Sequence, residues 1–215
     1  MKVEIWSDYV CPYCYMGKKR FEEGLSQFEG KDSVDIEFKS FELDPHAKVD
    51  GNPSVYALLE KKYGLNRERA SQTLEDITRQ AKQVGLNYNM DITIQTNTFD
   101  AHRLTHYAKT LGLAVTFSER LFKAHFTDGL HIGDRQALIT LAEEVGMSKE
   151  DVLKILEEGQ FAEEVHKDEQ DAQKLGVRGV PFFLIDGKHI VSGAQPSDVF
   201  LKALRHAALI DSSTI

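Results

Sequence analysis

The first forty residues switch between two hydrophobic periods, one typical of strands and the other of helices. Residues 2–6 alternate polar and apolar side chains, which predicts a half-buried strand. Small or apolar side chains then recur every three or four positions, as on one face of a helix, at Cys14, Gly17, Phe21, Leu25 and Phe28. Residues 34–38 alternate again. A strand, a helix and a strand at this spacing predict a βαβ unit with parallel strands and a right-handed crossover.

The long middle of the chain has helical periods throughout. Between residue 53 and about residue 159, apolar side chains form stripes with steps of three or four residues, for example Ala70, Leu74, Ile77 and Ala81. Thr116 and Ser148 each precede an acidic residue by three positions, a pattern typical of a capped helix start. We expect about six helices of ordinary length here and no strand.

Strand patterns return toward the C-terminus. A helical stripe over residues 161–175 precedes the fully apolar run 181–185. A tight turn at residues 186–188 leads into a second short strand at 189–191, so this pair is expected to be an antiparallel hairpin. A last helix is expected from Ser197 onward.

The order of these elements predicts the fold class. Strand-helix-strand, a helical block, and then helix-strand-strand-helix is the order of an α/β, thioredoxin-like fold with a large all-helical insertion. Residues 1–52 and 160–215 are expected to form the thioredoxin-like domain, and residues 53–159 the inserted helical subdomain.

The candidate chemistry lies where the first strand passes into the first helix. The two cysteines of the chain, Cys11 and Cys14, form a C-x-x-C motif at this junction. Pro12 suits the first helical position, which puts Cys11 at the N-cap. Unpaired backbone N–H groups and the positive end of the helix dipole favour an anion there, so Cys11 is predicted to attack as a thiolate. Cys14, one turn further on and facing the core, is predicted to be the resolving thiol.

Two other roles for the cysteine pair fit the sequence less well. A structural zinc site needs four ligands, and His102 and His106 would have to complete it from a distant part of the chain. A purely structural disulfide would close a very small loop and would therefore add little stability. A redox-active dithiol without a metal is the favoured interpretation.

The net charge and the hydropathy of the chain limit the classes of partner that we expect. The formal net charge of −8 argues against a nucleic-acid partner, which would require a clustered basic face. No apolar run approaches the roughly 18 residues of a membrane span, and no secretory leader pattern follows Met1. We therefore expect a cytoplasmic protein with no membrane partner, a setting in which C-x-x-C is typical of redox activity.

Four motifs resemble those of a known family. They are DYVCPYC at residues 8–14, NTFDAHRL at 97–104, GVPFF at 179–183 and SGAQP at 192–196. With them the chain resembles the DsbA-like thioredoxin superfamily, and within it the cytoplasmic FrnE-like branch, over nearly its whole length. The resemblance implies that Pro181 is a cis-proline facing the dithiol, and so a catalytic position beside Cys11 and Cys14. A cis bond there would turn the Val180 backbone toward an extended substrate segment.

The residues around the dithiol give the expected substrate contacts: Pro12, Tyr13, Val180 and His102. His102 and Arg103 flank the apolar stripe of their helix, which predicts boundary side chains; the alternative is a role near the dithiol. Periplasmic DsbA proteins have a histidine between the two cysteines, whereas Tyr13 supplies no cation to the thiolate. This difference predicts a reduction potential between those of thioredoxin and DsbA.

The sequence as a whole favours a thiol-disulfide oxidoreductase or isomerase that acts on protein or small-molecule thiols and disulfides. Its redox group is the dithiol itself, and glutathione is a candidate co-substrate. The first alternative is a glutathione-dependent enzyme of the kappa-class transferase or 2-hydroxychromene-2-carboxylate isomerase kind, whose members generally have serine where Cys11 stands. The second is a non-enzymatic binding module or holdase.

Overall fold

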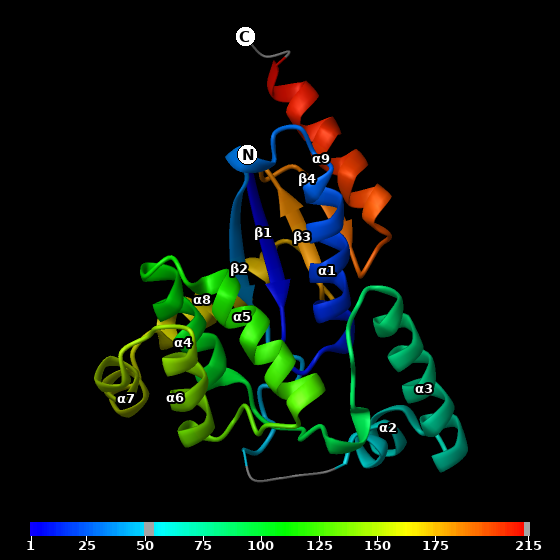
Figure 1. Ribbon diagram of the computed structural model, residues 1–215, viewed down its shortest axis with the longest axis vertical. Helices are drawn as coiled ribbons and strands as arrows, with labels where there is room; N and C mark the ends of the chain where they lie inside the picture. The colour runs from blue at the N-terminus through cyan, green and yellow to red at the C-terminus, as the bar shows by residue number, and fades with distance from the viewer. Residues whose placement is uncertain (50–53, 213–215) are drawn as a thin grey trace.

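The centre of the molecule is a four-stranded sheet (Figure 1). It is seen in a computed structural model that describes residues 1–49 and 54–212. The strands are β1 (Lys2–Ser7), β2 (Asp35–Ser40), β3 (Phe182–Ile185) and β4 (His189–Ser192), and they lie in the order β2-β1-β3-β4. β1 and β2 are parallel, as a βαβ unit requires. β3 is antiparallel to both β1 and β4, so the predicted hairpin is confirmed.

Helices cover both faces of this sheet. α1 (Pro12–Ser26) and α9 (Ser197–Ser212) pack together on one face, where they bury Phe21 and Phe200 against Phe183. α8 (Ala162–Lys174) lies on the other face, where the indole of Trp6 donates a hydrogen bond to the Asp168 carbonyl at 2.9 Å. One face of the sheet is therefore buried, and α8 covers part of the other face, where Ile190 of β4 stays exposed.

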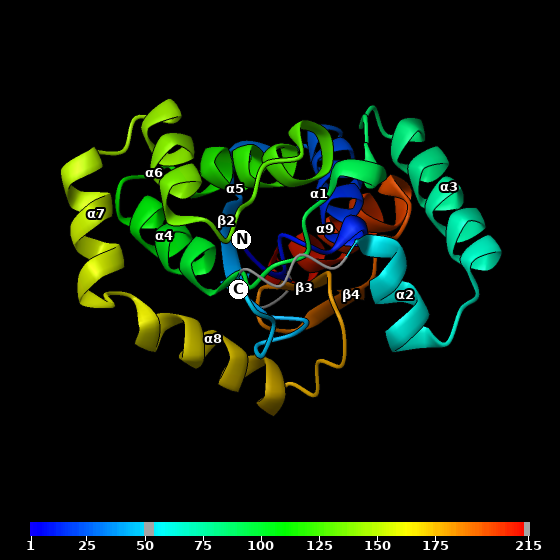
Figure 2. The ribbon, with the colours of Figure 1, turned by 90° about the horizontal axis from the view of Figure 1, so that it is seen from below.

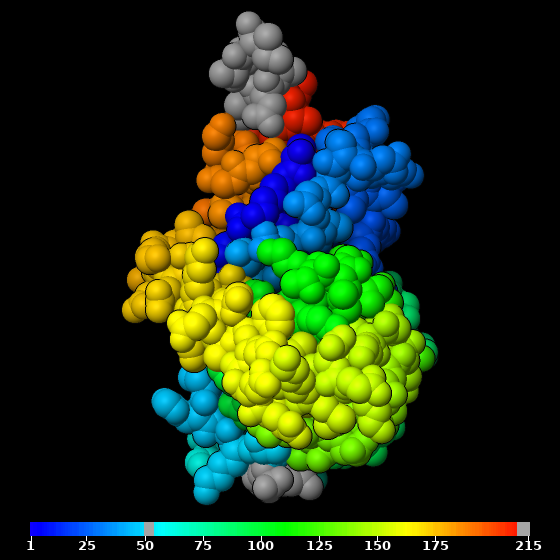
Figure 3. Space-filling model, turned by 90° about the vertical axis from the view of Figure 1, so that its left-hand side faces the viewer, coloured from blue at the N-terminus to red at the C-terminus, as the bar shows by residue number. Residues whose placement is uncertain are grey.

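A helical block follows β2 and lies below the end of β1 (Figures 1 and 3). Its helices are α2 (Val55–Tyr63), α3 (Arg67–Gln83), α4 (Phe99–Thr110), α5 (Ala114–Lys123), α6 (Arg135–Glu144) and α7 (Lys149–Glu158), with a π-helical turn at Ala124–Asp128. Viewed from below, α2 and α3 lie on one side and α4 to α7 on the other (Figure 2). The block thus surrounds the end of the sheet at which α1 begins.

The observed element order confirms the predicted fold class, a thioredoxin-like α/β fold with a large helical insertion. The predicted boundary between residues 52 and 53 lies outside the described residues, and the division into two domains stays a prediction. No helix in the described ranges is long and apolar enough to cross a membrane.

One of the two predicted helix starts is wrong. Ser148 caps α7 by accepting a hydrogen bond from the Asp151 amide at 3.3 Å, as its pattern predicts. Thr116 lies inside α5, whose N-cap is Leu113. The chain already turns at Gly112, where φ is +71°, so α5 starts before the capping pattern.

Charged side chains connect the helical block and α8 to the sheet. The Glu37 carboxylate on β2 pairs with Lys109 of α4 and, at 3.1 Å, with Lys39. Lys39 also pairs with Asp168 of α8 at 3.0 Å, and His106 lies 3.1 Å from the same carboxylate. Burial raises the pKa of Glu37, but its lysine partners outweigh burial and hold the pKa at about 2. Glu37 therefore stays ionised and keeps α4 attached to β2.

Candidate active site

Cys11 occupies the N-cap of α1, as the sequence predicts. Its backbone is extended, with φ −91° and ψ 112°, and Pro12 follows in the first turn. The Cys11 side chain is 4% exposed, and its Sγ donates a hydrogen bond to the Val180 carbonyl at 3.7 Å. The sulfur therefore lies at the positive end of the α1 dipole and against the segment that leads into β3.

Cys14 lies one turn further along α1 and is 2% exposed. Burial raises the pKa of the Cys14 thiol, and the adjacent Cys11 sulfur raises it further, against smaller opposing effects of Ser7 and the Asp8 backbone. Both cysteines are free thiols in this structure. A buried, protonated thiol attacks poorly in solution but can attack a mixed disulfide held beside it, which fits the resolving role predicted for Cys14.

The Val180–Pro181 peptide bond is cis, as the resemblance implies. The proline ring packs closely on Gly17 of α1, where an added Cβ would lie 2.8 Å from Pro181 Cγ. A side chain at residue 17 would therefore push the cis-proline segment away from Cys11. This contact explains why a glycine stands in the buried stripe of α1.

The two residues between the cysteines have different surroundings. The Pro12 carbonyl accepts a hydrogen bond from the Tyr88 hydroxyl at 2.7 Å. Tyr13 is 41% exposed and makes no hydrogen bond with any described residue. Burial, and then the negative charges of Cys11 and of Asp76 on α3, raise the pKa of Tyr13. The exposed side chain at position 13 is thus close to both the dithiol and an acidic residue of the helical block.

Aromatic rings from the helical block form the wall behind the dithiol. Tyr15 of α1 stacks on Phe122 with ring centroids 5.0 Å apart, and Tyr88 stacks on Phe126 at 4.6 Å. Both cysteines belong to the same buried cluster as these rings. The helical block is therefore part of the environment of the dithiol.

A buried polar cluster is formed by Asp8, three residues before Cys11, by His102 of α4 and by His125, whose pKa responds to the charge of Asp8. Their exposed fractions are 1%, 2% and 0%. His102 Nε2 lies 3.6 Å from Asp8 Oδ1, and the other Asp8 oxygen accepts a hydrogen bond from the Leu43 amide at 2.7 Å. Asp8 belongs to a motif that the sequence singles out, but its burial is visible only in the structure.

The predicted boundary position of His102 and Arg103 is wrong, because both side chains are 2% exposed. The His102 ring packs on Tyr9 with centroids 4.9 Å apart and faces Asp8. A direct contact between His102 and a substrate, as the sequence suggests, would require the buried polar cluster to open. His106, the other histidine of the zinc alternative, is bound by Ser40 and Asp168, and no group of three potential metal ligands occurs within residues 1–49 and 54–212.

Arg103 has a structural environment. Its Nε donates to the Gln160 carbonyl at 2.7 Å, and its terminal nitrogens donate to the Ile155 carbonyl and, at 2.5 Å, to the Asp100 carboxylate. The guanidinium thus joins α4 to the end of α7, and its partners do not include the dithiol.

We expect Arg103→Met to lower the free energy of unfolding by about 2 kcal/mol, because the charged hydrogen bonds to the Gln160 carbonyl and the Asp100 carboxylate are lost, while the Ile155 carbonyl keeps its backbone donors. Urea denaturation gives this value, and the rate of thiol exchange should stay within about twofold of wild type. Arg135→Met is the matched control, because Arg135 pairs with the same Asp100 at 3.0 Å but is 59% exposed. A change in exchange rate without loss of stability would instead give Arg103 a role at the dithiol.

Comparison with known proteins places this site in a family. A profile of the DSBA-like thioredoxin domain matches residues 2–205. The chain is similar to a probable DsbA oxidoreductase from Streptomyces coelicolor, with 40% identity, a TM-score of 0.92, and coverage of 96% of this chain and 89% of that one. It is 31% identical to the Bacillus subtilis protein YwbO over 204 residues, which are 94% of each chain. A 2-hydroxychromene-2-carboxylate isomerase has the same fold, with a TM-score of 0.74 and 16% identity over the full length of both chains. The chain, with its C-x-x-C pair at a helix N-terminus, belongs to the family of DSBA-like thioredoxin domain proteins.

Proposed function

We propose that this protein is a cytoplasmic thiol-disulfide oxidoreductase of the FrnE-like branch that exchanges or isomerises disulfides through Cys11 and Cys14. The observation that carries the proposal is the position of the Cys11 sulfur. It lies at the N-cap of α1, 3.7 Å from the carbonyl that precedes the cis-proline, with the buried Cys14 one turn behind it. A nucleophilic sulfur, a resolving sulfur and a backbone edge for an extended substrate thus occur together.

The proposed reaction proceeds through a mixed disulfide. The Cys11 thiolate attacks one sulfur of a substrate disulfide, forms a Cys11–substrate bond and releases the other substrate sulfur as a thiolate. Cys14 then loses its proton and attacks the Cys11 sulfur, which releases the second substrate thiolate. The substrate has gained two electrons, its two thiolates can take up the proton released by Cys14 and one from solvent, and the protein holds a Cys11–Cys14 disulfide. In isomerisation, the released substrate thiolate attacks another disulfide of the substrate, and the thiolate freed there displaces Cys11 from the mixed disulfide. The reverse of the two-step sequence oxidises a substrate dithiol.

The presence of both sulfurs distinguishes this proposal from the glutathione-transferase or isomerase alternative. Those enzymes resemble this chain in fold but generally hold glutathione with a serine at the position of Cys11. A cysteine there, with a second cysteine buried behind it, favours dithiol cycling, and it leaves glutathione the role of a candidate co-substrate.

The test is equilibration of the purified protein in glutathione buffers, followed by trapping of the free thiols. We expect Cys11 and Cys14 to oxidise together, with a potential of roughly −170 to −240 mV. That range overlaps the glutathione poise of the cytosol, about −220 to −260 mV by biochemical extraction, so such a couple could exchange electrons with glutathione in either direction. A stable glutathione adduct without an internal disulfide would favour the transferase or isomerase alternative.

We expect Tyr13→His to raise the reduction potential by about 30 mV, which corresponds to about 1.4 kcal/mol. An imidazolium near Cys11 would stabilise its thiolate and hence the reduced protein, and the nearby carboxylate of Asp76 would favour the charged imidazole. Tyr13→Phe is the control, because it keeps the ring without a charge, and it should change the potential by less than about 10 mV. An unchanged reduction potential in Tyr13→His would show that residue 13 does not determine the potential of the Cys11–Cys14 couple.

A further inference from the structure

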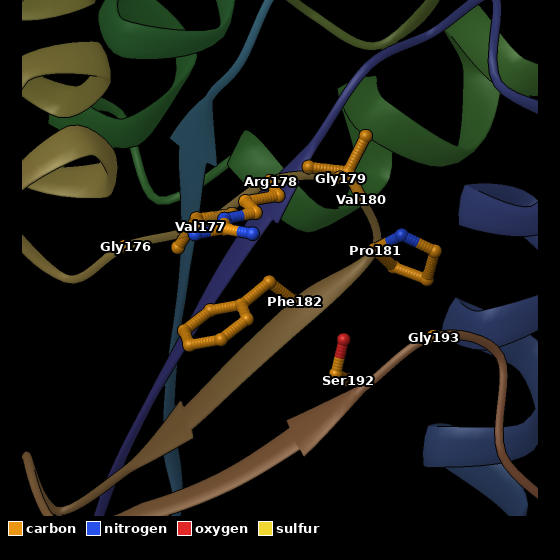
Figure 4. Close-up of a pocket in the computed structure, with 9 residues that line it drawn as sticks. All are labelled: Gly176, Val177, Arg178, Gly179, Val180, Pro181, Phe182, Ser192 and Gly193. Atoms are coloured by element: carbon orange, nitrogen blue, oxygen red, sulfur yellow. The ribbon is translucent and has the colours of Figure 1, made fainter.

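A pocket of about 400 Å³ adjoins the cis-proline segment. Its lining comes from residues 176–182, before and at the start of β3, and from residues 192 and 193 at the end of β4 (Figure 4). Val180 is shared with the dithiol, because its carbonyl oxygen accepts the hydrogen bond from the Cys11 sulfur. Cys11 itself is not a lining residue, so a ligand whose charged end lies in this pocket would have to extend past Val180 to bring its sulfur to Cys11. The volume suits a small ligand.

The charge in this pocket comes from Arg178. Its side chain is exposed and makes no hydrogen bond or ion pair with any residue in the described ranges. Arg20 and Arg103, in contrast, are held by backbone carbonyls. Figure 4 shows the Arg178 side chain on one side of the pocket and the Ser192 hydroxyl on the other. The pocket thus offers a free guanidinium and a hydroxyl, both hydrogen-bond donors.

The unpaired guanidinium of Arg178 is a local positive charge in a protein whose net charge is −8. The overall field repels anions, so a local cation is needed to hold an anionic substrate at the dithiol. The planar, forked guanidinium matches a carboxylate through two parallel hydrogen bonds. The pocket is therefore suited to a ligand that carries a carboxylate.

We propose that Arg178 and this pocket bind the carboxylate of a small thiol or disulfide and so position its sulfur at Cys11. This inference rests on the proposed function and adds a specificity residue to it. The chemistry is the exchange described above: two small thiolates in turn attack the Cys11–Cys14 disulfide and then the mixed disulfide on Cys11. They leave as one small disulfide, and the protein becomes a dithiol.

The experiment measures the rate at which three thiols reduce the oxidised full-length protein, by acid quench and thiol trapping. The probes are glutathione, its diethyl ester, in which both carboxylates are blocked, and dithiothreitol, which has none. In Arg178→Gln we expect the rate with glutathione to fall about tenfold, and the rates with the ester and with dithiothreitol to change by less than about twofold. Arg178→Lys should retain part of the glutathione rate, because it keeps the charge but loses the fork.

Lys188→Gln is the matched control. Lys188 is exposed in the β3–β4 turn, outside the pocket lining, so this variant removes the same charge from the same hairpin. Its glutathione rate should stay within about twofold of wild type. Equal effects of Arg178→Gln on all three thiols, or no effect on any, would overturn the proposal. If no thiol, dithiothreitol included, reduces the oxidised wild-type protein, the proposed function itself fails.

Discussion

Cys14→Ser is expected to accumulate mixed disulfides with glutathione or with substrate proteins, whereas Cys11→Ser should trap none. Cys11 lies at the N-cap and contacts the cis-proline segment, while Cys14 is buried behind it with a raised pKa. Without the resolving thiol, the intermediate on Cys11 can be released only by an external thiol. Without Cys11 the nucleophile is lost, and the exchange rate should fall by roughly a thousandfold or more. Intact-mass measurement after alkylation quantifies both results.

The double variant Cys11→Ser, Cys14→Ser serves as the background, since neither sulfur is present. Equal trapping by the two single variants would contradict the division of labour between the sulfurs. The holdase alternative makes a different prediction, because Cys11→Ser would then suppress the aggregation of an unfolding client as well as wild type does. A measurement of aggregation beside the exchange assay separates binding from redox chemistry.

The sequence could predict those parts of the site that depend on local signals. The alternation of β1, the proline after Cys11 and the stripe of α1 are all contained within residues 2–28, and together they place Cys11 at the N-cap. The element order then indicates the thioredoxin-like fold, because the two strand-bearing ends of the chain complete one sheet. The cis form of the Val180–Pro181 bond follows from the resemblance to the family, since a proline at a strand start can be either cis or trans.

The burial of His102 and Arg103 could not be predicted from the hydrophobic pattern of α4 alone. A polar residue beside an apolar stripe is normally partly exposed, and the stripe of α4 does not show what will cover its polar side. The covering carbonyls of Ile155 and Gln160 come from the end of α7, about fifty residues later. Asp8 and Tyr88 were missed as neighbours of the dithiol for the same reason, because their burial or partners depend on tertiary packing.

His125 is the most isolated member of the buried polar cluster. It lies in the π-helical turn Ala124–Asp128, is 0% exposed, and packs edge-on against Phe126 at 4.5 Å. Neither ring nitrogen has a hydrogen-bond partner within the described residues. Burial lowers the pKa of His125 from 6.5 to about 4, with Asp8 acting in the opposite direction and His131 in the same one. The folded protein therefore keeps this imidazole neutral at a pH where an unfolded chain protonates it.

We expect this residue to make the protein acid-sensitive. Above pH 6.5 neither state protonates His125, so its effect on stability is constant. Between pH 6.5 and about pH 4 the unfolded state binds the proton and the folded state does not, so stability falls by about 3 kcal/mol as the pH falls. Urea denaturation followed by fluorescence of the buried Trp6, at pH steps between 7.5 and 4.5, measures the loss. His125→Phe keeps an aromatic ring but has no titrating group. The free energy of unfolding of the wild type should fall faster than that of the variant below pH 6.5. The other titrating groups contribute equally to both proteins, so the difference reports on His125 alone. Curves that run parallel over this range would show that His125 is not the source of the acid sensitivity.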